Sequence, residues 1–225
     1  MQPRAIIFDF DGVLADSEVL SNMVIAEIVT ELGVPTTLDD AYRTYMGKRL
    51  NDVIATIERV IGRKLPADFA DSYQQRTFDA FRARLKPVDG ARDFIEAWRK
   101  LPQCIASSSS PERLALSLDV LNMAPLFEGR VFSASNVARG KPHPDVFLYA
   151  AAQIGVDARD CIVIEDSVGG VTAGRSSGAT VIGFTAAGHI QPGHSARLRD
   201  AGADHVAASF AELDRIIRPL LHRES

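Results

Sequence analysis

The stretch IIFDFDGVLADS, residues 6–17, decides how the rest of the chain is interpreted, because an apolar run ends there in two carboxylates and a glycine. Such a run predicts a buried strand that delivers Asp9 and Asp11 to the edge of a sheet. Aspartate is disfavoured in strands, and two neighbouring carboxylates repel each other unless a cation or a proton separates their charges. Mg²⁺ suits such a site because it prefers carboxylate oxygens and accepts substrate phosphate beside them. The stretch therefore indicates phosphoryl-transfer chemistry with Mg²⁺ as cofactor.

The composition predicts a protein without nucleic-acid or membrane partners. The 225 residues carry a formal net charge of −4, and the basic residues are scattered, whereas a nucleic-acid site needs a basic patch. No apolar run approaches the ~20 residues of a membrane span, and the start MQPR leads directly into a strand, so we expect a cytoplasmic protein. Cys104 and Cys161 lie in apolar runs and are predicted to pack in the core. Monomer and homodimer both stay open.

Short β-prone runs separated by helical patterns predict a Rossmann-like α/β core, in which helices cover both faces of a parallel sheet. The runs are 5–8, 104–106, 130–132, 161–164, 180–184 and 204–206. Between the first two runs, residues 16–85 show helical patterns and no strand signal. We therefore predict an all-helical cap domain at 16–85, inserted into a catalytic core of residues 1–15 and 86–225. Its helices are expected to begin at Ser17, after Thr37, at Leu50 and at Pro66.

Polar residues that follow the predicted strands form one consistent set. In doubly wound sheets, ligands bind outside the carboxyl ends of the strands, so these residues should lie close together. They are Asp9 and Asp11 after the first strand, Ser107 after the second, Lys141 after the third, and Glu165 with Asp166 after the fourth. Phosphoryl transfer needs a nucleophile, a metal, partners for the phosphate oxygens and a proton donor, and this set contains a candidate for each.

Four segments, DFDGVL at 9–14, Ser107, KP at 141–142 and EDS at 165–167, are similar to the four ordered motifs of the haloacid dehalogenase-like hydrolase superfamily. The resemblance spans nearly the whole chain. The helical insert after the first motif is similar to that of the subfamily holding β-phosphoglucomutase, phosphoglycolate phosphatase and phosphogluconate phosphatase-like enzymes. This resemblance implies a Mg²⁺-dependent phosphatase that acts on a small phosphorylated metabolite, a sugar phosphate or a phosphosugar acid.

The resemblance also implies a role for each motif residue. Asp9 would attack phosphorus to form an aspartyl-phosphate, and Asp11 would protonate the leaving alcohol and then activate water. Ser107 would hydrogen-bond a phosphoryl oxygen, and Lys141 would neutralise the phosphate and the crowded carboxylates. The implied metal ligands are Asp9, the backbone carbonyl of Asp11, Asp166 and, either through water or as a supporting partner only, Glu165.

Four further residues are candidates for substrate binding, each with a structural alternative. Ser108 belongs to the serine run 107–110, whose register against the phosphate is open. The amide of Asn136 could line the pocket or shape a turn. Lys48 and Arg49, in the insert, could contact a distal anionic or polyhydroxyl part of the substrate, or form a solvated pair at a helix start.

Other reactions of the superfamily remain as alternatives. Asp11 argues against dehalogenases, which lack an acid at this position, and against phosphonatases, which carry a different residue there. A β-phosphoglucomutase-type phosphomutase is the first alternative, although the histidine of that enzyme aligns with Ser21, and its Gly-x-Ser-Arg loop, whose arginine aligns near Leu50, is replaced here by GKRL at 47–50. A non-catalytic phosphometabolite-binding module is the second, and the presence of every charged motif residue argues against it.

Overall fold

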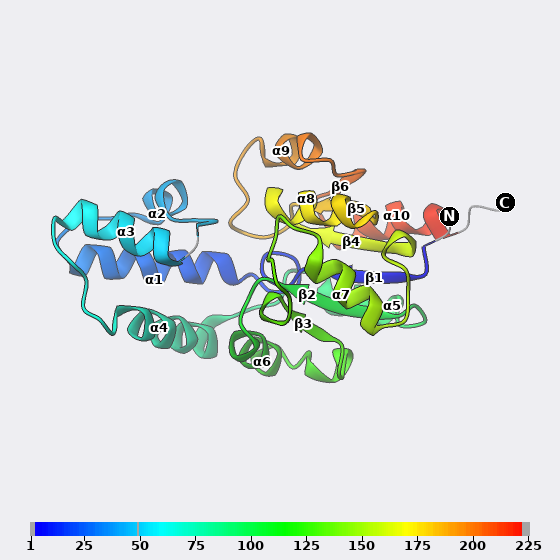
Figure 1. The fold of residues 1–225 in the computed structure, drawn as a ribbon, viewed down its shortest axis with the longest axis horizontal. Coiled ribbons are helices and arrows are strands. Elements are labelled where there is room, and N and C mark those ends of the chain that lie inside the picture. Colours follow the sequence, from blue (N-terminus) through cyan, green and yellow to red (C-terminus); the bar gives the residue numbers. More distant parts are fainter. Residues whose placement is uncertain (1–2, 49, 222–225) are drawn as a thin grey trace. The chain divides into compact units, whose positions relative to one another are not determined.

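The structure, a computed structural model, describes residues 3–48 and 50–221, and these contain a six-stranded parallel sheet (Figure 1). The strands are β1 (Ala5–Phe8), β2 (Gln103–Ser107), β3 (Val131–Ser133), β4 (Cys161–Glu165), β5 (Thr180–Phe184) and β6 (His205–Ala207). Each predicted run coincides with a strand to within one residue at either end. The predicted Rossmann-like α/β fold is therefore confirmed.

The strand order, β3-β2-β1-β4-β5-β6, places β1 at the centre of the sheet. From β1 the chain moves outward through β2 to β3, then returns to the other side of β1 and moves outward through β4 and β5 to β6. Phe8 at the end of β1 is opposite Ile105 of β2 and Ile164 of β4. In open parallel sheets, ligands bind outside the carboxyl ends of the strands where the order reverses. That position is flanked here by the residues that follow β1 and β4.

Helices cover both faces of the sheet, which explains why the strands are continuous apolar runs (Figure 1). They are α5 (Ala91–Ala97), α6 (Pro111–Val120), α7 (Asp145–Gln153), α8 (Val168–Ser177), α9 (His194–Asp200) and α10 (Phe210–Leu221). On one face Phe147 of α7 packs in a cluster with Ile7. On the other, Phe8 meets Phe94 of α5 edge-on, with ring centroids 6.1 Å apart. None of the helices in residues 3–48 and 50–221 combines the length and the apolar character that a membrane span needs.

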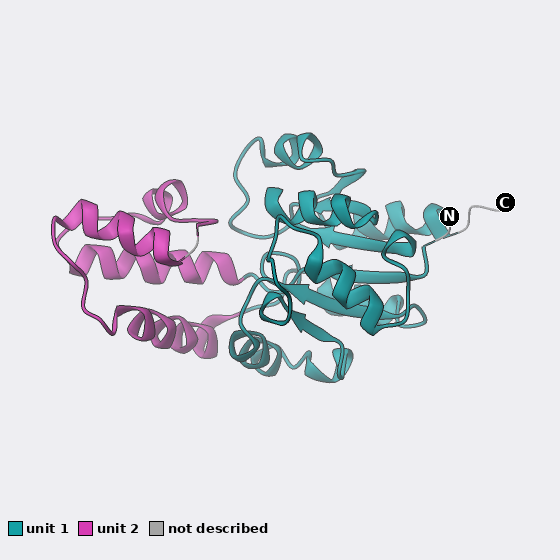
Figure 2. Ribbon diagram, in the orientation of Figure 1, with its two compact units in different colours: residues 1–16, 86–225 teal, residues 17–85 magenta. Residues whose placement is uncertain are grey.

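The chain divides into two compact units, which we call the sheet unit and the helical unit (Figure 2). The sheet unit comprises residues 1–16 and 86–225, and the helical unit residues 17–85. The predicted boundaries differ from this division by one residue, Asp16. Asp16 belongs to the sheet unit because its backbone N–H donates to the Lys86 carbonyl (3.0 Å) and its carboxylate accepts from the N–H of Gly188 (3.1 Å).

Within residues 17–48 and 50–85, four helices surround a separate apolar core. They are α1 (Ser17–Glu31), α2 (Leu38–Thr44), α3 (Leu50–Ile61) and α4 (Phe69–Arg84). Arg76 of α4 binds Glu31 of α1 through two hydrogen bonds of 2.6 and 2.9 Å, which fixes these helices side by side. The fourth helix begins three residues later than predicted, because a turn intervenes in which the N–H of Phe69 donates to the Pro66 carbonyl (3.1 Å).

Both cysteines are free and buried, as predicted from their place in strands. Cys104 and Cys161 belong to the apolar cluster on one face of the sheet. Burial raises the pKa of the Cys161 thiol to about 12, and it also raises the pKa of Cys104. Both side chains therefore remain thiols at neutral pH and act as small apolar groups.

Candidate active site

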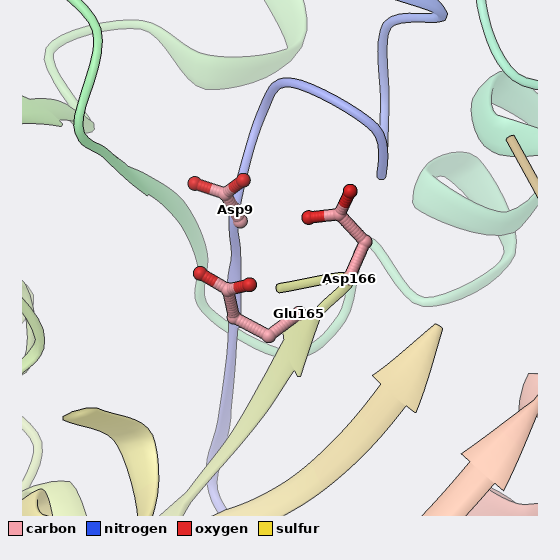
Figure 3. A group of neighbouring side chains, drawn as sticks. All are labelled: Asp9, Glu165 and Asp166. Carbon is pink, nitrogen blue, oxygen red and sulfur yellow. The ribbon is translucent and has the colours of Figure 1, made fainter. Parts of the chain in front are cut away.

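Three carboxylates meet at the carboxyl ends of β1 and β4 (Figure 3). Asp9 follows β1, Glu165 is the last residue of β4, and Asp166 comes next. One oxygen of each side chain lies within 4.8 Å of the others, and all three side chains are buried. The fold therefore brings together the acids of the first and fourth motifs, and we call these three residues the carboxylate cluster.

Lys141 lies against this cluster. Its Nζ donates to Asp9 Oδ1 at 2.7 Å, to Glu165 Oε1 at 2.6 Å and to the backbone carbonyl of Ala106 at 3.1 Å. The ring of Phe147 lies beneath the ammonium group, with its centroid 4.7 Å away. Burial lowers the pKa of a lysine, but Asp9 and Glu165 outweigh that effect and raise the pKa of Lys141 above its usual value. Lys141 is therefore a fixed cation.

Negative charge still exceeds positive charge here, since one ammonium group faces three carboxylates. Burial raises the pKa of Asp9 well above its usual value; Lys141 opposes the rise, while Glu165 and Asp166 add to it. A divalent cation would relieve this repulsion, and closely spaced carboxylate oxygens are the ligands that Mg²⁺ takes. The donor set therefore fits the predicted metal.

Glu165 is engaged by protein partners through both of its oxygens. Oε1 accepts from Lys141, and Oε2 accepts from the N–H (2.9 Å) and the O–H (3.0 Å) of Ser167. Ser167 also caps α8, because its Oγ accepts from the N–H of Gly170 (3.0 Å). A Cβ at Gly170 would lie 1.7 Å from Glu165 Oε1, so only glycine allows α8 to approach this closely. Of the two roles left open for Glu165, this arrangement favours the supporting partner.

Asp11 is held by two side chains that are not among the predicted residues. Arg113 Nη2 donates to Oδ1 at 2.8 Å, and Ser109 Oγ donates to Oδ2 at 2.5 Å. Arg113 lies in the first turn of α6, where its backbone N–H donates to the N-cap Ser110 (3.3 Å). The N-cap serine and the following proline predict this helix, but the direction of a long arginine side chain depends on the tertiary packing. The metal contact implied for Asp11, through its backbone carbonyl, stays a prediction.

Ser107 and Ser108 differ in their surroundings. Ser107 ends β2 and is 1% exposed, and its Oγ accepts from the N–H of Ser109 at 3.1 Å. Ser108, the next residue, is exposed. Ser133 at the end of β3 joins the same loop, because its Oγ donates to the Ser109 carbonyl at 2.7 Å. The structure thus places Ser107 at the edge of the sheet that holds Asp9, while contacts of either serine to phosphate stay predictions.

Among the remaining substrate-binding candidates, Asn136 is the one that belongs to the sheet unit. Asn136 Oδ1 accepts from the N–H of Ser133 (3.3 Å) in a capping box, which is the turn-forming alternative. Lys48 is exposed in the helical unit, and Arg49 lies outside the described residues. Substrate contacts of these three residues stay predictions.

Two histidines that are not among the predicted residues contact Asp166. His189 Nε2 lies 3.0 Å from Asp166 Oδ2, and His194 Nε2 donates to the backbone carbonyl of Asp166. His189 lies in the loop between β5 and α9, and His194 begins α9. The rule that selects residues after the first four strands also applies to the loop after the fifth, so the sequence does contain a signal for them.

Known proteins share this sequence pattern and fold. The sequence model of the haloacid dehalogenase-like hydrolase family matches residues 3–178 of this chain, and this range contains every motif residue. The 6-phosphogluconate phosphatase of Escherichia coli strain K12 is 29% identical over 190 residues, which cover 84% of this chain and 86% of that enzyme. A β-phosphoglucomutase of Mycobacterium bovis is 30% identical over 241 residues, and the match covers 93% of this chain and 91% of that enzyme. A hydrolase of this family from Deinococcus radiodurans R1, solved with bound phosphate and sodium, has a TM-score of 0.84 and 33% identity, with 97% of this chain and 96% of that one covered.

Gly170→Ala is expected to destabilise the sheet unit, whereas Gly169→Ala is not. A Cβ at position 170 would lie 1.7 Å from Glu165 Oε1 and 1.8 Å from its carboxyl carbon, whereas nothing lies within 4 Å of one at 169. Overpacking of this kind costs about 1–3 kcal/mol, whereas alanine in an open helical position gains up to ~1 kcal/mol over glycine. Urea unfolding of the two variants measures the difference, and equal midpoints would contradict the tight approach of α8 to Glu165.

Proposed function

Because the chain belongs to the haloacid dehalogenase-like hydrolase family, we propose that it hydrolyses a phosphorylated sugar or sugar acid through an aspartyl-phosphate on Asp9. Its relatives include named phosphatases, and its enzyme class is phosphoric monoester hydrolase. The observation that carries the mechanism is the carboxylate cluster with the buried cation of Lys141. A module that only bound phosphate would surround it with cations and N–H donors and would not place three carboxylates beside it.

The first step transfers the phosphoryl group to Asp9. A carboxylate oxygen of Asp9 bonds to phosphorus while the ester P–O bond breaks, and the leaving alkoxide takes the proton of Asp11. Lys141, 2.7 Å from Asp9, offsets the negative charge that the carboxylate and the phosphoryl group bring together. Ser107 donates its hydroxyl hydrogen to a phosphoryl oxygen.

The second step transfers the phosphoryl group to water. Asp11, now a carboxylate, removes a proton from a water molecule whose oxygen bonds to phosphorus, and the P–O bond to Asp9 breaks. Inorganic phosphate leaves, Asp9 is again a carboxylate, and Asp11 is again protonated. Both steps need the Asp11 carboxyl group to keep one position relative to Asp9. The hydrogen bonds from Arg113 (2.8 Å) and Ser109 (2.5 Å) support this.

Asp9, Asp166 and the backbone carbonyl of Asp11 would hold Mg²⁺, with Glu165 supporting them through Lys141 and Ser167. When bound, the cation supplies positive charge that stabilises the phosphoryl oxygens during transfer. The three clustered carboxylates, which face the single ammonium group of Lys141, support this assignment, since they indicate a site with too little positive charge of its own.

The relatives support the substrate class. Two of them are named 6-phosphogluconate phosphatase and hexitol phosphatase B, and both names refer to phosphorylated sugar derivatives. The β-phosphoglucomutase relative keeps a phosphomutase as a second candidate. The resemblance implies a histidine in phosphomutases at the position of Ser21, which here is buried in α1 and donates to the Ser17 carbonyl (3.0 Å), so a hydroxyl engaged in its own helix stands there. This favours the phosphatase. A cytoplasmic location remains an expectation from the sequence.

Phosphate release from a panel of sugar phosphates, phosphosugar acids and phosphoglycolate, with Mg²⁺ and with EDTA, tests the proposal. We expect metal-dependent release that the Asp9→Asn variant lacks. Isomerisation of a sugar phosphate without phosphate release, once a bisphosphate primer is added, would establish the phosphomutase instead. Release that is unchanged in Asp9→Asn would disprove the aspartyl-phosphate.

Arg113→Met is expected to slow the cleavage of alkyl phosphates much more than that of p-nitrophenyl phosphate. Arg113 holds the carboxyl group that protonates the leaving group, and a nitrophenolate leaves without that proton. Because kcat/KM covers only the steps up to phosphoryl transfer to Asp9, we expect a loss of about 10–100-fold for the alkyl ester and little change for the aryl ester. Arg113→Lys, which keeps a cation, is the matched control. Equal losses on both esters would contradict this role of Arg113.

Lys48→Ala is expected to raise KM for a phosphosugar acid and to leave p-nitrophenyl phosphate unaffected. We propose that Lys48 attracts the distal carboxylate of the substrate, which the aryl ester lacks. Loss of one charge-assisted contact, worth about 1.5–3 kcal/mol, would raise KM about 10–100-fold. Lys64→Ala, which removes an exposed lysine paired with Glu58 in the same unit, is the control. A similar KM change on both substrates would rule out the contact.

A further inference from the structure

The loop between β5 and α9 and the first residue of α9 each carry an imidazole that contacts Asp166. His189 contacts its carboxylate, and His194 its backbone carbonyl. Asp166 directly follows β4, and the loop follows the neighbouring strand β5, so both leave the same edge of the sheet. The side chain of Asp166 is thus held from the β5–α9 loop, and its main chain is held from the start of α9.

The contact between His189 and Asp166 is buried and closely packed. Nε2 lies 3.0 Å from Oδ2, and the two side chains are 7% and 8% exposed. Since a carboxylate oxygen can only accept, Nε2 carries the hydrogen of this bond. A Cβ at Gly12, where φ is +80°, would lie 2.0 Å from Asp166 Oδ2 and 2.8 Å from His189 Cε1. The carboxylate and the imidazole therefore both rest against the backbone of Gly12, which restricts their rotation.

The contact between His194 and the Asp166 backbone has a defined direction. Nδ1 of His194 lies 2.8 Å from Nη2 of Arg197. A guanidinium group can only donate, so Nδ1 accepts and the ring hydrogen is on Nε2, facing the Asp166 carbonyl. His194 is therefore a neutral donor that ties the main chain of Asp166 to α9.

The loop that carries His189 is held in place by hydrogen bonds of its own. The N–H of Gly188, next to His189, donates to the carboxylate of Asp16 (3.1 Å). The N–H of Ile190 donates to the Ala187 carbonyl (3.2 Å), and Nε2 of Gln191 donates to the His189 carbonyl (3.2 Å). These bonds fix the backbone on both sides of His189, so the position of its imidazole is set by the sheet unit.

We propose that His189 is a positioning residue that sets the direction of the Asp166 carboxylate toward the metal, with His194 and Arg197 fixing its main chain. The inference rests on the proposed metal role of Asp166. Figure 3 shows the Asp166 carboxylate with one oxygen toward Asp9 and the other away from it. Because His189 binds Oδ2, the carboxylate cannot rotate freely about its last bond. Partners of this kind raise metal affinity by orienting a ligand before the metal arrives.

Binding of Mg²⁺ alone, measured by isothermal titration calorimetry on the full chain after treatment with EDTA and dialysis, tests this proposal. His189→Leu removes the donor and is expected to weaken Mg²⁺ binding about 10–100-fold. His189→Gln keeps an N–H donor near the position of Nε2 and should bind within about threefold of the parent protein, as should the control His205→Gln, at an exposed position on β6. Mg²⁺ binding by His189→Leu that equals the parent value would overturn the proposal.

A second measurement on the unaltered protein covers the case in which His189→Leu does not fold. Long-range ¹H–¹⁵N NMR of the histidine rings should show the hydrogen of His189 on Nε2 and a shift of this resonance on addition of Mg²⁺. A His189 ring that does not respond to saturating Mg²⁺ would overturn the proposal. Metal-dependent phosphate release that Asp9→Asn abolishes would still establish the proposed function, so the two can fail separately.

Discussion

The buried ammonium group of Lys141, between the carboxylates of Asp9 and Glu165, is the interaction on which the rest of the site depends. Its side chain is 7% exposed and that of Glu165 is fully inaccessible. A charge buried without a partner costs several kcal/mol, so none of these groups could be kept in the interior alone. Asp9 follows β1, Glu165 ends β4 and Lys141 follows β3 in the chain, so the pairing exists only when the strands have the order that places β1 beside β4. The ion pairs of Lys141 with Asp9 and Glu165 therefore depend on this strand order.

Two carboxylates only two residues apart are given different surroundings by this fold. Asp9 accepts a hydrogen bond from Lys141 and belongs to the carboxylate cluster, whereas Asp11 accepts hydrogen bonds from Arg113 and Ser109. The chain can separate them because β1 ends at Phe8 and the backbone turns at Gly12. Different surroundings for neighbouring acids are the usual basis for different roles, here the proposed nucleophile and the proposed proton donor.

Close backbone approach is the second constraint on the site. Gly12 lies against the Asp166 carboxylate and Gly170 against that of Glu165, and a single methyl group at either position would occupy space that a carboxylate oxygen fills. The acids are thus positioned by packing as well as by hydrogen bonds. The β5–α9 loop adds to this packing through His189, which contacts the Asp166 carboxylate and also lies against Gly12. Acids positioned in this way have little room to rearrange, which favours the preorganised geometry that the proposed phosphoryl transfer requires.

The sequence by itself determined the strands, the helical insert and the identity of the motif acids, because apolar periodicity and carboxylates at strand ends are local features. It also determined the family, since DFDGVL, Lys141 and EDS occur in the expected order. Only the tertiary structure decided which side chains hold these acids. Arg113, Ser109 and His189 come from α6 and from loops after β2 and β5, and the direction of a long or aromatic side chain depends on neighbours remote in sequence. Likewise, the support that Ser167 and Lys141 give Glu165 follows from burial and strand order, which no local pattern encodes.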